Sequence, residues 1–354
     1  MLTKRELEQL KITPPDKALY KAVKDNWDAV AKPLDSMGEF EPLLSRIGAI
    51  LGDVSLDIEK KAVVVMCADN GIVEEHISQS GQEVTAKVAA SMGRRTSSVC
   101  RMAAAVGADV FPVDIGVNSK ERIPGVTDRK VRRGTGNFLK ESAMTEEEAL
   151  RAIGTGMQLV AELKRDGYKL IATGEMGIGN TTTSSAVAAA LLSCEVEEIT
   201  GRGAGLSDAG LSHKIEVIRQ ALRFHGLKEN EPLRILSTVG GLDIAGLTGV
   251  FIGGAVHHIP IVIDGVISAV AALTAERLVP GVKEYVIPSH SSREPAALHI
   301  LEELGVRPVI DAGLALGEGT GAVMMFGLLD IARTVYGERT TFADIDMEPY
   351  ERFC

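Results

Sequence analysis

The chain has 354 residues, of which 45% are hydrophobic and 24% charged, enough for one large α/β domain or two ordinary ones. Its formal net charge of -10 argues against a nucleic-acid partner, because phosphates require a basic face. The one basic run, residues 128–134, is interpreted as a solvated loop. Aromatic residues make up only 4%, so the core is expected to consist of Ala, Val, Ile and Leu.

The cysteines and the N-terminal sequence bear on the compartment. MLTKRELEQLK lacks the apolar stretch of a signal peptide, and the apolar segment 259–275 is interrupted by Asp264. We therefore expect a cytoplasmic protein without a membrane partner. Four cysteines lie far apart without a CxxC motif, which predicts reduced thiols: Cys67, Cys100, Cys194 and Cys354.

Short β-branched runs recur along the chain, each followed by a small-residue turn and a helical pattern. Their nearly continuous apolarity is typical of strands buried on both faces of a parallel sheet. Strands are predicted at 62–68, 109–117, 169–175, 234–240, 259–265, 285–289 and 308–314. Helices are predicted at 85–107, 145–167, 181–193 and 207–226.

This alternation predicts a doubly wound α/β fold with a mostly parallel, Rossmann-like sheet. Thr145 and Glu148 have the spacing of a capping box and mark the start of one helix. Neither chain end has a strand pattern. We therefore predict one large α/β domain over residues 31–330, and a small, mainly helical lobe from residues 1–30 and 331–354.

Polar residues gather after the predicted strands, where open α/β sheets bind their ligands. Any one of them alone fits a helix cap or a turn residue. Together they favour a cleft. The residues that follow five of the strands are Glu175, Asp243, Asp264, the run 289–292 and Glu318.

The sequence GEMGIGNTTTSS (174–185) is a strand-to-helix turn whose amides at Gly179, Asn180 and Thr181 could bind an anion. It lacks the lysine of a P-loop and the third glycine of the dinucleotide fingerprint that would begin at Gly177. An ordinary capped helix therefore stays open as an alternative.

Two other segments could contribute to an anion site. GRGAGLSD (201–208) contains Gly203 and precedes Lys214, which is either a phosphate counter-charge or a solvated surface lysine. In PSHSSRE, Ser291 and Ser292 precede a helix predicted from about Arg293. Helix capping accounts for one serine, and the second permits anion binding.

Other chemistries lack their motifs. The seven histidines form no HExxH or other ligand spacing, no GxSxG elbow is present, and no cysteine has an adjacent base. We therefore predict no metal and no cofactor, and nucleophilic hydrolysis is not favoured.

Glu318 is the only ionisable residue of the glycine-rich run GLALGEGTGA (313–322). Its flanking glycines would let a planar ligand approach closely. Burial in an apolar cleft would raise its pKa into the range of a general base. A glutamate that interacts with the dipole of the following helix is an equally good interpretation from the residues alone.

Nine segments in order resemble one family: ADNGIVEE, VTAKVAASM, VDIGV, GEMGIGNTTTSSAVAAALL, GRGAGLSD, VGGLDIAGLTG, DGVISAVAALTA, PSHSSREPA and LGEGTGA. From about Lys32 to about Phe326 the chain resembles nicotinate-nucleotide–dimethylbenzimidazole phosphoribosyltransferases, which activate the lower-ligand base of cobalamin. The resemblance implies transfer of 5-phosphoribose from nicotinate mononucleotide to an aromatic base, giving an α-ribotide and nicotinate. It also implies that Glu318 is the catalytic base.

The resemblance implies further site residues. Glu175 would stabilise positive charge near the ribose or bind its hydroxyls. The Gly179–Thr181 helix start, Lys214, Ser291 and Ser292 would hold the phosphate, and Ser80 and Leu316 would contact the acceptor ring. The full set of expected substrate-binding residues is Ser80, Val88, Gly177, Gly179, Asn180, Thr181, Gly203, Lys214, Asp243, Asp264, Gly265, Ser291, Ser292, Ala315 and Leu316.

The chain departs from the family pattern at two of these positions. Relatives commonly carry Arg at the position of Ala315 and Gln at the position of Val88, on the helix that lines the acceptor pocket. KPLDSMG (32–38) also replaces the usual KPPGSLG. Acceptors other than dimethylbenzimidazole, such as purines or phenols, therefore stay open.

The expected partners are the two small-molecule substrates and either a second copy of the chain or a paralogue in a heterodimer. A non-catalytic subunit that completes a paralogue's dimer is one alternative to an enzyme. A nucleotide-binding dehydrogenase is another, disfavoured by the missing fingerprint.

Overall fold

The computed structural model describes residues 2–352, so Cys354 lies outside the described residues. Its centre is a six-stranded sheet in the order β3-β2-β1-β4-β5-β6, with every neighbouring pair parallel. The predicted α/β class and mostly parallel sheet are confirmed. The strands are β1 (Lys61–Ala68), β2 (Ala108–Gly116), β3 (Thr127–Asp128), β4 (Leu170–Met176), β5 (Ile261–Val262) and β6 (Val286–Ile287).

The central strand β1 explains why the sheet forms here. All eight of its residues, KAVVVMCA, are buried, as expected of a strand covered on both faces. It pairs with β2 on one side and β4 on the other. The β1–β4 register places Met66 opposite Glu175, so Glu175 lies at the carboxyl edge of the sheet, where ligands of such folds bind.

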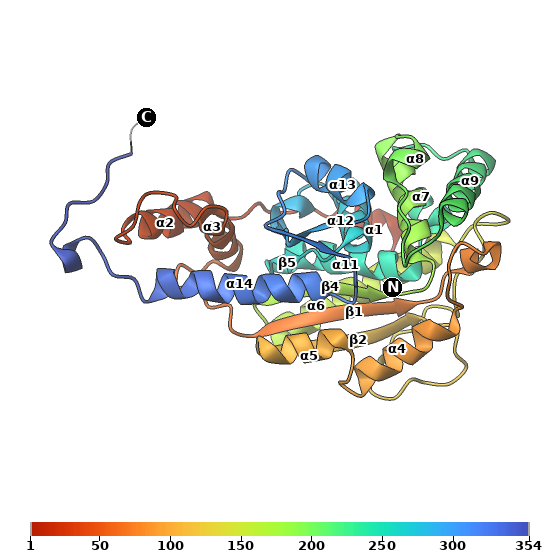
Figure 1. Cartoon of the computed structure of the whole chain (residues 1–354), viewed down its shortest axis with the longest axis horizontal. Helices are drawn as coiled ribbons and strands as arrows, with labels where there is room; N and C mark the ends of the chain where they lie inside the picture. Colours follow the sequence, from red (N-terminus) through yellow and green to blue (C-terminus); the bar gives the residue numbers. More distant parts are fainter. Residues whose placement is uncertain (1, 353–354) are drawn as a thin grey trace.

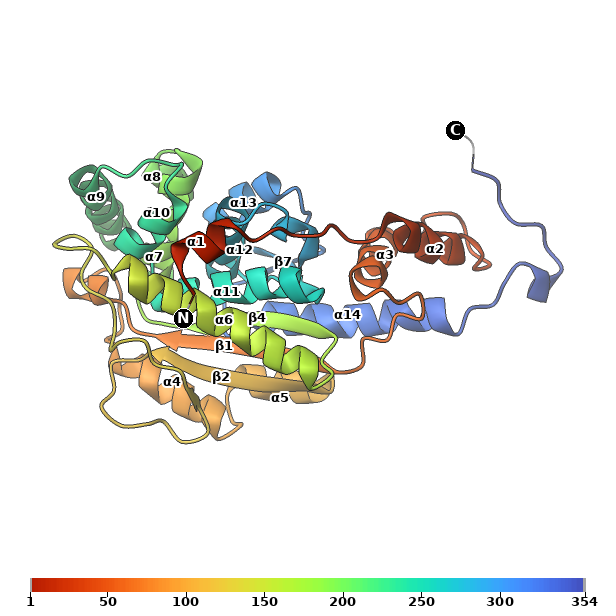
Figure 2. The ribbon, with the colours of Figure 1, turned by 180° about the vertical axis from the view of Figure 1, so that it is seen from behind.

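Helices cover both faces of the sheet (Figures 1 and 2). On one face lie α4 (Glu83–Gly93), α5 (Ser98–Ala105) and α14 (Thr320–Gly337). On the other, α11 (Leu242–His257) contacts the central strands and α6 (Glu146–Arg165) packs against α11. The predicted capping box at the start of α6 is present, since Thr145 and Glu148 each bond the other's backbone.

The remaining elements surround this core. They are α7 (Asn180–Leu192), α8 (Val196–Ile199), α9 (Asp208–His225), α10 (Pro232–Val239), α12 (Val266–Leu278) and α13 (Ala296–Leu304), with three 3₁₀ helices, η1 (Gly71–Glu75), η2 (Val282–Tyr285) and η3 (Ala343–Ile345). A separate two-stranded sheet pairs β7 (His290–Ser292) with β8 (Ile310–Leu314).

Four predicted elements differ from the structure. The single helix predicted at 85–107 is wrong, because α4 ends at Gly93 and a new helix, α5, begins at Ser98 after the side chain of Ser97 caps it. The strand predicted at 234–240 is wrong, because these residues belong to α10, which begins at Pro232; Asp243 therefore follows a helix and lies in the first turn of α11. The run at 308–314 is a strand, but it pairs with β7 outside the main sheet. The helix expected from about Arg293 begins at Ala296.

The helices α2 (Lys17–Asp28) and α3 (Phe40–Leu51) contact the C-terminal segment where they and the end of α14 project from the body (Figure 1). The rings of Trp27 and Tyr336 lie 5.2 Å apart, and Val30 forms a bridge with Thr341. By contrast, α1 (Lys4–Glu8) lies against α6 on the body (Figure 2). The boundary between a large domain and a small lobe stays a prediction.

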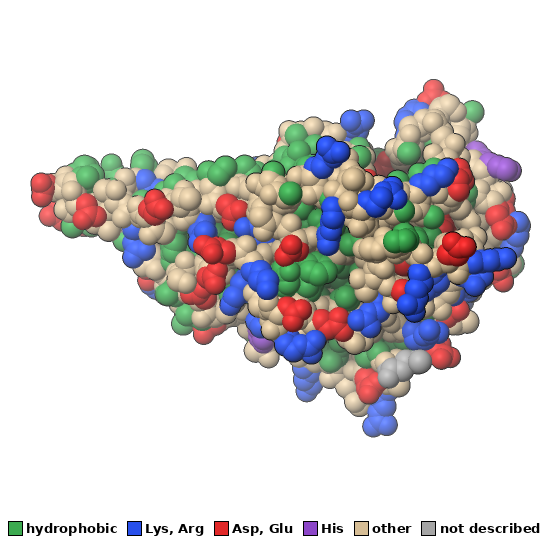
Figure 3. All heavy atoms as spheres, turned by 90° about the horizontal axis from the view of Figure 1, so that it is seen from below, with side chains coloured by type: hydrophobic (Ala, Val, Ile, Leu, Met, Phe, Trp, Pro, Cys, Tyr) green, Lys and Arg blue, Asp and Glu red, His purple; other side chains and the backbone are tan. Residues whose placement is uncertain are grey.

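Acidic and basic side chains are interspersed over the face seen in Figure 3. The basic run 128–134 is a loop in which three cations form ion pairs: Arg129 with Glu162, Lys130 with Asp114, and Arg132 with Glu148. No helix in residues 2–352 has the length and apolarity to cross a membrane.

Candidate active site

A cavity of about 190 Å³ opens at the carboxyl ends of β4 and β5. It is bounded by the turn into α7, the segment after β5, the strands β7 and β8, and the glycine-rich loop before α14. The predicted site residues that line it are Glu175, Gly177, Asn180, Thr181, Gly203, Asp264, Gly265, Ser292, Ala315, Leu316 and Glu318. Residues far apart in sequence are thus brought together at one edge of the sheet.

The remaining predicted site residues lie outside this lining. Gly179 lines a smaller adjoining cavity of about 80 Å³. Lys214 and Asp243 contact lining residues by hydrogen bonds, and Ser291 is the neighbour of Ser292 in β7. Ser80 precedes α4 and Val88 lies on it, and neither borders the cavity. Their roles at the acceptor stay predictions.

The loop carrying Glu318 has an unusual backbone. Gly317, Glu318 and Gly319 have φ values of +81°, +62° and +93°, all in the left-handed region. Glycine adopts this region freely, whereas it costs a residue with a side chain roughly 1–2 kcal/mol. The position of Glu318 is therefore maintained by surrounding contacts.

The Glu318 side chain is half-buried, and its Oε2 atom is buried with no hydrogen-bond partner among residues 2–352. Burial raises the pKa of this carboxyl, although the backbone N–H of Val99 on α5 acts in the opposite direction. Because a buried carboxylate oxygen without a partner is costly, it is available to a proton donor on a ligand.

Two further acids meet at Asn180, the first residue of α7. The Asn180 Nδ2 group donates to Glu175 Oε2 and, at 3.0 Å, to Asp243 Oδ2. Burial raises the pKa of Glu175 to about 8, with the Asp243 charge as a second cause. Burial also raises the pKa of Asp243 to about 6. The raised pKa favours the protonated form of Glu175, which can donate a hydrogen bond.

Lys214 is fully buried on α9, so the solvated-surface interpretation is wrong. Its Nζ donates to Thr181 Oγ1 and to the Gly201 carbonyl, both at 3.0 Å. Burial lowers its pKa to about 8, against the nearby charge of Glu294. Because an ammonium group has three donors, one N–H stays available for a ligand beside the start of α7.

Asp264 lines the cavity, and its carboxylate is turned to the start of α14. Its Oδ1 accepts from Gly321 N at 2.8 Å and Ala322 N at 3.1 Å, and its Oδ2 accepts from Gly319 N at 3.1 Å. The amides that a glycine-rich loop would offer to phosphate are therefore already occupied by an internal carboxylate.

Glu294 borders the cavity but was not among the predicted site residues, although it belongs to the segment PSHSSRE. His290, in the predicted run 289–292, borders the cavity as well. Glu294 Oε1 accepts from Gly203 N at 2.8 Å and so connects two of the surrounding loops. No spacing rule could have identified Glu294, because it contacts a segment distant in the sequence.

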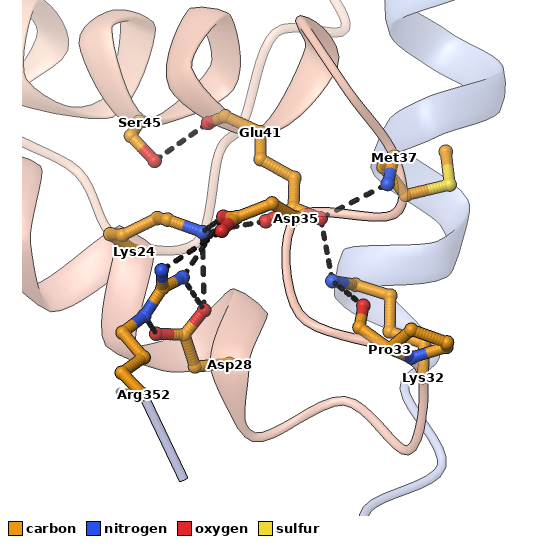
Figure 4. Close-up of polar contacts among 9 residues, drawn as sticks. All are labelled: Lys24, Asp28, Lys32, Pro33, Asp35, Met37, Glu41, Ser45 and Arg352. Carbon is orange, nitrogen blue, oxygen red and sulfur yellow. Dashed lines mark hydrogen bonds and ion pairs between the residues drawn. The ribbon is translucent and has the colours of Figure 1, made fainter. Parts of the chain in front are cut away.

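A separate acidic cluster lies in the projecting part of the molecule (Figure 4). Oxygen atoms of Asp28, Asp35 and Glu41 lie within 4.8 Å of one another, as in a metal site. However, Lys24 contacts all three acids, and Arg352 contacts both aspartates. We therefore interpret the cluster as a set of ion pairs that connects the two chain ends.

Comparisons with known proteins point to one family. A phosphoribosyltransferase family model matches residues 12–346. The chain is 46% identical over 324 residues to a nicotinate-nucleotide–dimethylbenzimidazole phosphoribosyltransferase of Acetivibrio thermocellus, covering 92% of each chain. It is 43% identical over 336 residues to one of Clostridium acetobutylicum, covering 95% of this chain and 96% of that protein.

Two solved structures are similar to this chain over most of its length. The crystal structure of CobT from Thermus thermophilus matches with a TM-score of 0.89 and 36% identity, covering 94% of this chain and all of the other. A second structure from that organism, described as a nicotinate-nucleotide–dimethylbenzimidazole phosphoribosyltransferase, matches with a TM-score of 0.87 and 35% identity, covering 94% of this chain and 99% of the other.

Proposed function

The chain belongs to the nicotinate-nucleotide–dimethylbenzimidazole phosphoribosyltransferase family and is an enzyme of the glycosyltransferase type, and on this premise we propose its reaction. It transfers 5-phosphoribose from nicotinate mononucleotide to an aromatic lower-ligand base, giving an α-ribotide and nicotinate. The observation that supports this most directly is the unpartnered, buried carboxylate oxygen of Glu318 at the cavity, among the described residues 2–352.

The chemistry of the two substrates explains why one base suffices. The donor's pyridinium ring is cationic, so it leaves as neutral pyridine nitrogen with the glycosidic electron pair and needs no general acid. The acceptor must lose its ring N–H proton while its other nitrogen attacks the anomeric carbon. Glu318 accepts that proton, and attack opposite the leaving group converts the β anomer to α. The raised pKa of Glu318 makes its carboxylate a stronger base than an exposed one.

The remaining residues bind and orient the donor. Because its raised pKa favours the protonated form of Glu175, we favour a role as hydrogen-bond donor to the ribose over stabilisation of positive charge. We assign the donor phosphate to the third N–H of Lys214 and the start of α7, and the support is the Lys214 hydrogen bond to Thr181 Oγ1 on that helix. Ala315 supplies no charge, so this chain relies on Lys214 for its phosphate counter-charge.

The apolar Val88 on α4 and the exposed Leu316 are the residues we propose at the acceptor, and they favour an apolar aromatic ring. We retain phenols as alternative acceptors, because Glu318 could remove an O–H proton through a water molecule.

The test is to incubate the pure chain with nicotinate mononucleotide and a panel of benzimidazoles, purines and phenols, and to measure nicotinate and ribotide. We expect activity with at least dimethylbenzimidazole. Replacement of Glu318 by Gln should lower kcat by roughly 10²- to 10⁴-fold. The exposed Glu302 on α13 provides the matched control, Glu302→Gln, with unchanged kcat.

The possible outcomes separate the parts of the proposal. No nicotinate release by the wild type with any acceptor would overturn the proposed reaction and favour a non-catalytic partner subunit. Near-normal kcat in Glu318→Gln, with release intact in the wild type, would overturn only the role of the base.

We further propose assembly as a homodimer or with a paralogue. The support is an exposed apolar stripe on α14, where Met324, Ile331 and Val335 are 42%, 66% and 36% exposed. Light scattering of the pure chain would report its mass directly. A cytoplasmic location stays a prediction.

A further inference from the structure

Glu318, the base proposed above, lies in a loop whose internal hydrogen bonds do not connect it to the sheet. Three successive residues, Gly317 to Gly319, have left-handed backbone conformations. Within the loop, the N–H and Oγ1 of Thr320 both donate to the Gly317 carbonyl, at 3.0 and 2.8 Å. These bonds close the turn but do not connect it to the sheet.

Asp264 makes that connection across 55 positions of sequence. Asp264 is 3% exposed, and its carboxylate accepts three backbone N–H groups, one from the residue after Glu318 and two from the first turn of α14. A carboxylate in this place satisfies amides that have no partner within the helix and interacts favourably with the helix dipole. Glu318 is thereby fixed between this anchor and the end of β4.

Asp264 is itself held by its neighbours. Its own N–H donates to Ser268 Oγ at 3.2 Å, and its carbonyl accepts from Ser289 Oγ at 3.4 Å. The His290 ring packs directly against Gly321, where a larger residue would displace it. Burial raises the pKa of Asp264, while the nearby His290 and the three amides act against that rise.

We propose that Asp264 is a positioning residue for the transfer reaction: its hydrogen bonds from the amide of Gly319 and from two amides of α14 set the backbone of Glu318, and so the direction in which the Glu318 carboxylate meets the acceptor. The inference rests on the proposed function. It differs from the expectation that Asp264 merely contacts the nucleotide, because it acts through Glu318.

The first test is Asp264→Asn, measured as kcat and KM with nicotinate mononucleotide and dimethylbenzimidazole. The asparagine Nδ2 group is a donor facing donor amides, so the anchor loses at least one bond without losing volume. We expect kcat to fall about 10²-fold, the cost of a catalytic group displaced by about 1 Å, with KM for the donor changed less than about threefold. A raised KM with unchanged kcat would overturn the proposal in favour of direct donor contact.

The second test places Asp264→Asn in the Glu318→Gln background. If Asp264 acts only through Glu318, the second substitution should lower the residual kcat less than about threefold, because residues that act as a unit are not additive. If the double variant instead lost kcat by the product of the two single-variant losses, the proposal would be overturned. A general structural role would lower the rate in both backgrounds alike.

Asp264→Asn could also prevent folding, and Thr320→Val then tests the same idea. This substitution removes only the hydrogen bond from Oγ1 to the Gly317 carbonyl. We expect kcat to fall roughly fivefold, which corresponds to the loss of one hydrogen bond. As for Asp264→Asn, the fall should occur only when Glu318 is present. An equal fall in the Glu318→Gln background would overturn the proposal. Inactivity of the wild type itself would instead refute the proposed function.

Discussion

Adding one methyl group to Gly174 should measure how closely the loop that carries the proposed base, Glu318, must approach the sheet. A Cβ atom on Gly174 would meet the Glu318 carbonyl oxygen first, then lie 2.7 Å from Glu318 C and 2.8 Å from Gly319 N. All three neighbours are backbone atoms. Ordinary contact begins at 3.4 Å, so the loop must retreat by about 0.7 Å or more.

The loop is the part that should move, because Gly174 lies within β4 and pairs with Val65 of the buried strand β1. A displacement approaching 1 Å at a catalytic group costs up to about 10²-fold in rate. We therefore expect Gly174→Ala to lower kcat by roughly 10- to 100-fold. Overpacking should also lower the free energy of unfolding by about 1–3 kcal/mol.

The assay is kcat and KM for nicotinate mononucleotide and dimethylbenzimidazole, with urea unfolding on the same preparations. Gly327→Ala is the matched control, since its Cβ would lie 3.4 Å from Val106 Cγ1 in ordinary contact. It should keep kcat within about twofold and favour the helix slightly. A folded Gly174→Ala protein with wild-type kcat would refute the reasoning that this contact fixes Glu318.

Three further predictions concern pH, donor binding and stability. Burial raises the pKa of Glu175 to about 8 in the folded protein. The contribution of Glu175 to the free energy of unfolding is therefore complete below about pH 4 and is lost as the pH rises toward 8. Glu175→Gln should flatten that decline in urea unfolding, by at most about 1.4 kcal/mol per pH unit between pH 5 and 7. Lys214→Met should raise KM for nicotinate mononucleotide roughly 10- to 100-fold in steady-state assays, since hydrogen bonds to charged groups contribute about 1.5–3 kcal/mol. Trp27→Ala should lower the free energy of unfolding by about 3–5 kcal/mol, because Trp27 is fully buried.

Each of these has an outcome that contradicts it. Parallel stability curves for wild type and Glu175→Gln would mean that Glu175 is ionised in the folded protein. An unchanged donor KM in Lys214→Met would remove Lys214 from the phosphate site. Tyr20, 37% exposed on the same helix as Trp27, provides a control whose Ala variant should change stability by less than about 0.5 kcal/mol.

The sequence predicts the central strands well because strands buried on both faces consist of nearly continuous apolar residues. The expected strands at 62–68, 109–117 and 169–175 agree with β1, β2 and β4 within one residue at each end. The apolar run at 234–240 has the same appearance but forms α10, since a short buried run has no period that separates strand from helix. Its Pro232, at the first helical position, was the available signal.

The site was predictable where chemistry is concentrated in one segment and unpredictable where it depends on contact between segments. Glu318 and the start of α7 stand out from their glycine-rich neighbours. That Asn180 connects Glu175 to Asp243 could not be inferred, because the two acids lie far apart in sequence and meet only through the fold. The burial of Lys214 could not be inferred from the sequence of its amphipathic helix either.

The contacts of Asp264 explain how an acid can occupy a glycine-rich loop that resembles a phosphate site. Such loops bind anions through free amides at a helix start, but here three of those amides already bind the Asp264 carboxylate. The two glycines beside Glu318 allow the left-handed turn, and a phosphate at the same amides would have to displace a buried side chain. This supports the proposal that α7 and Lys214 hold the phosphate and that the loop before α14 presents a base rather than binding an anion.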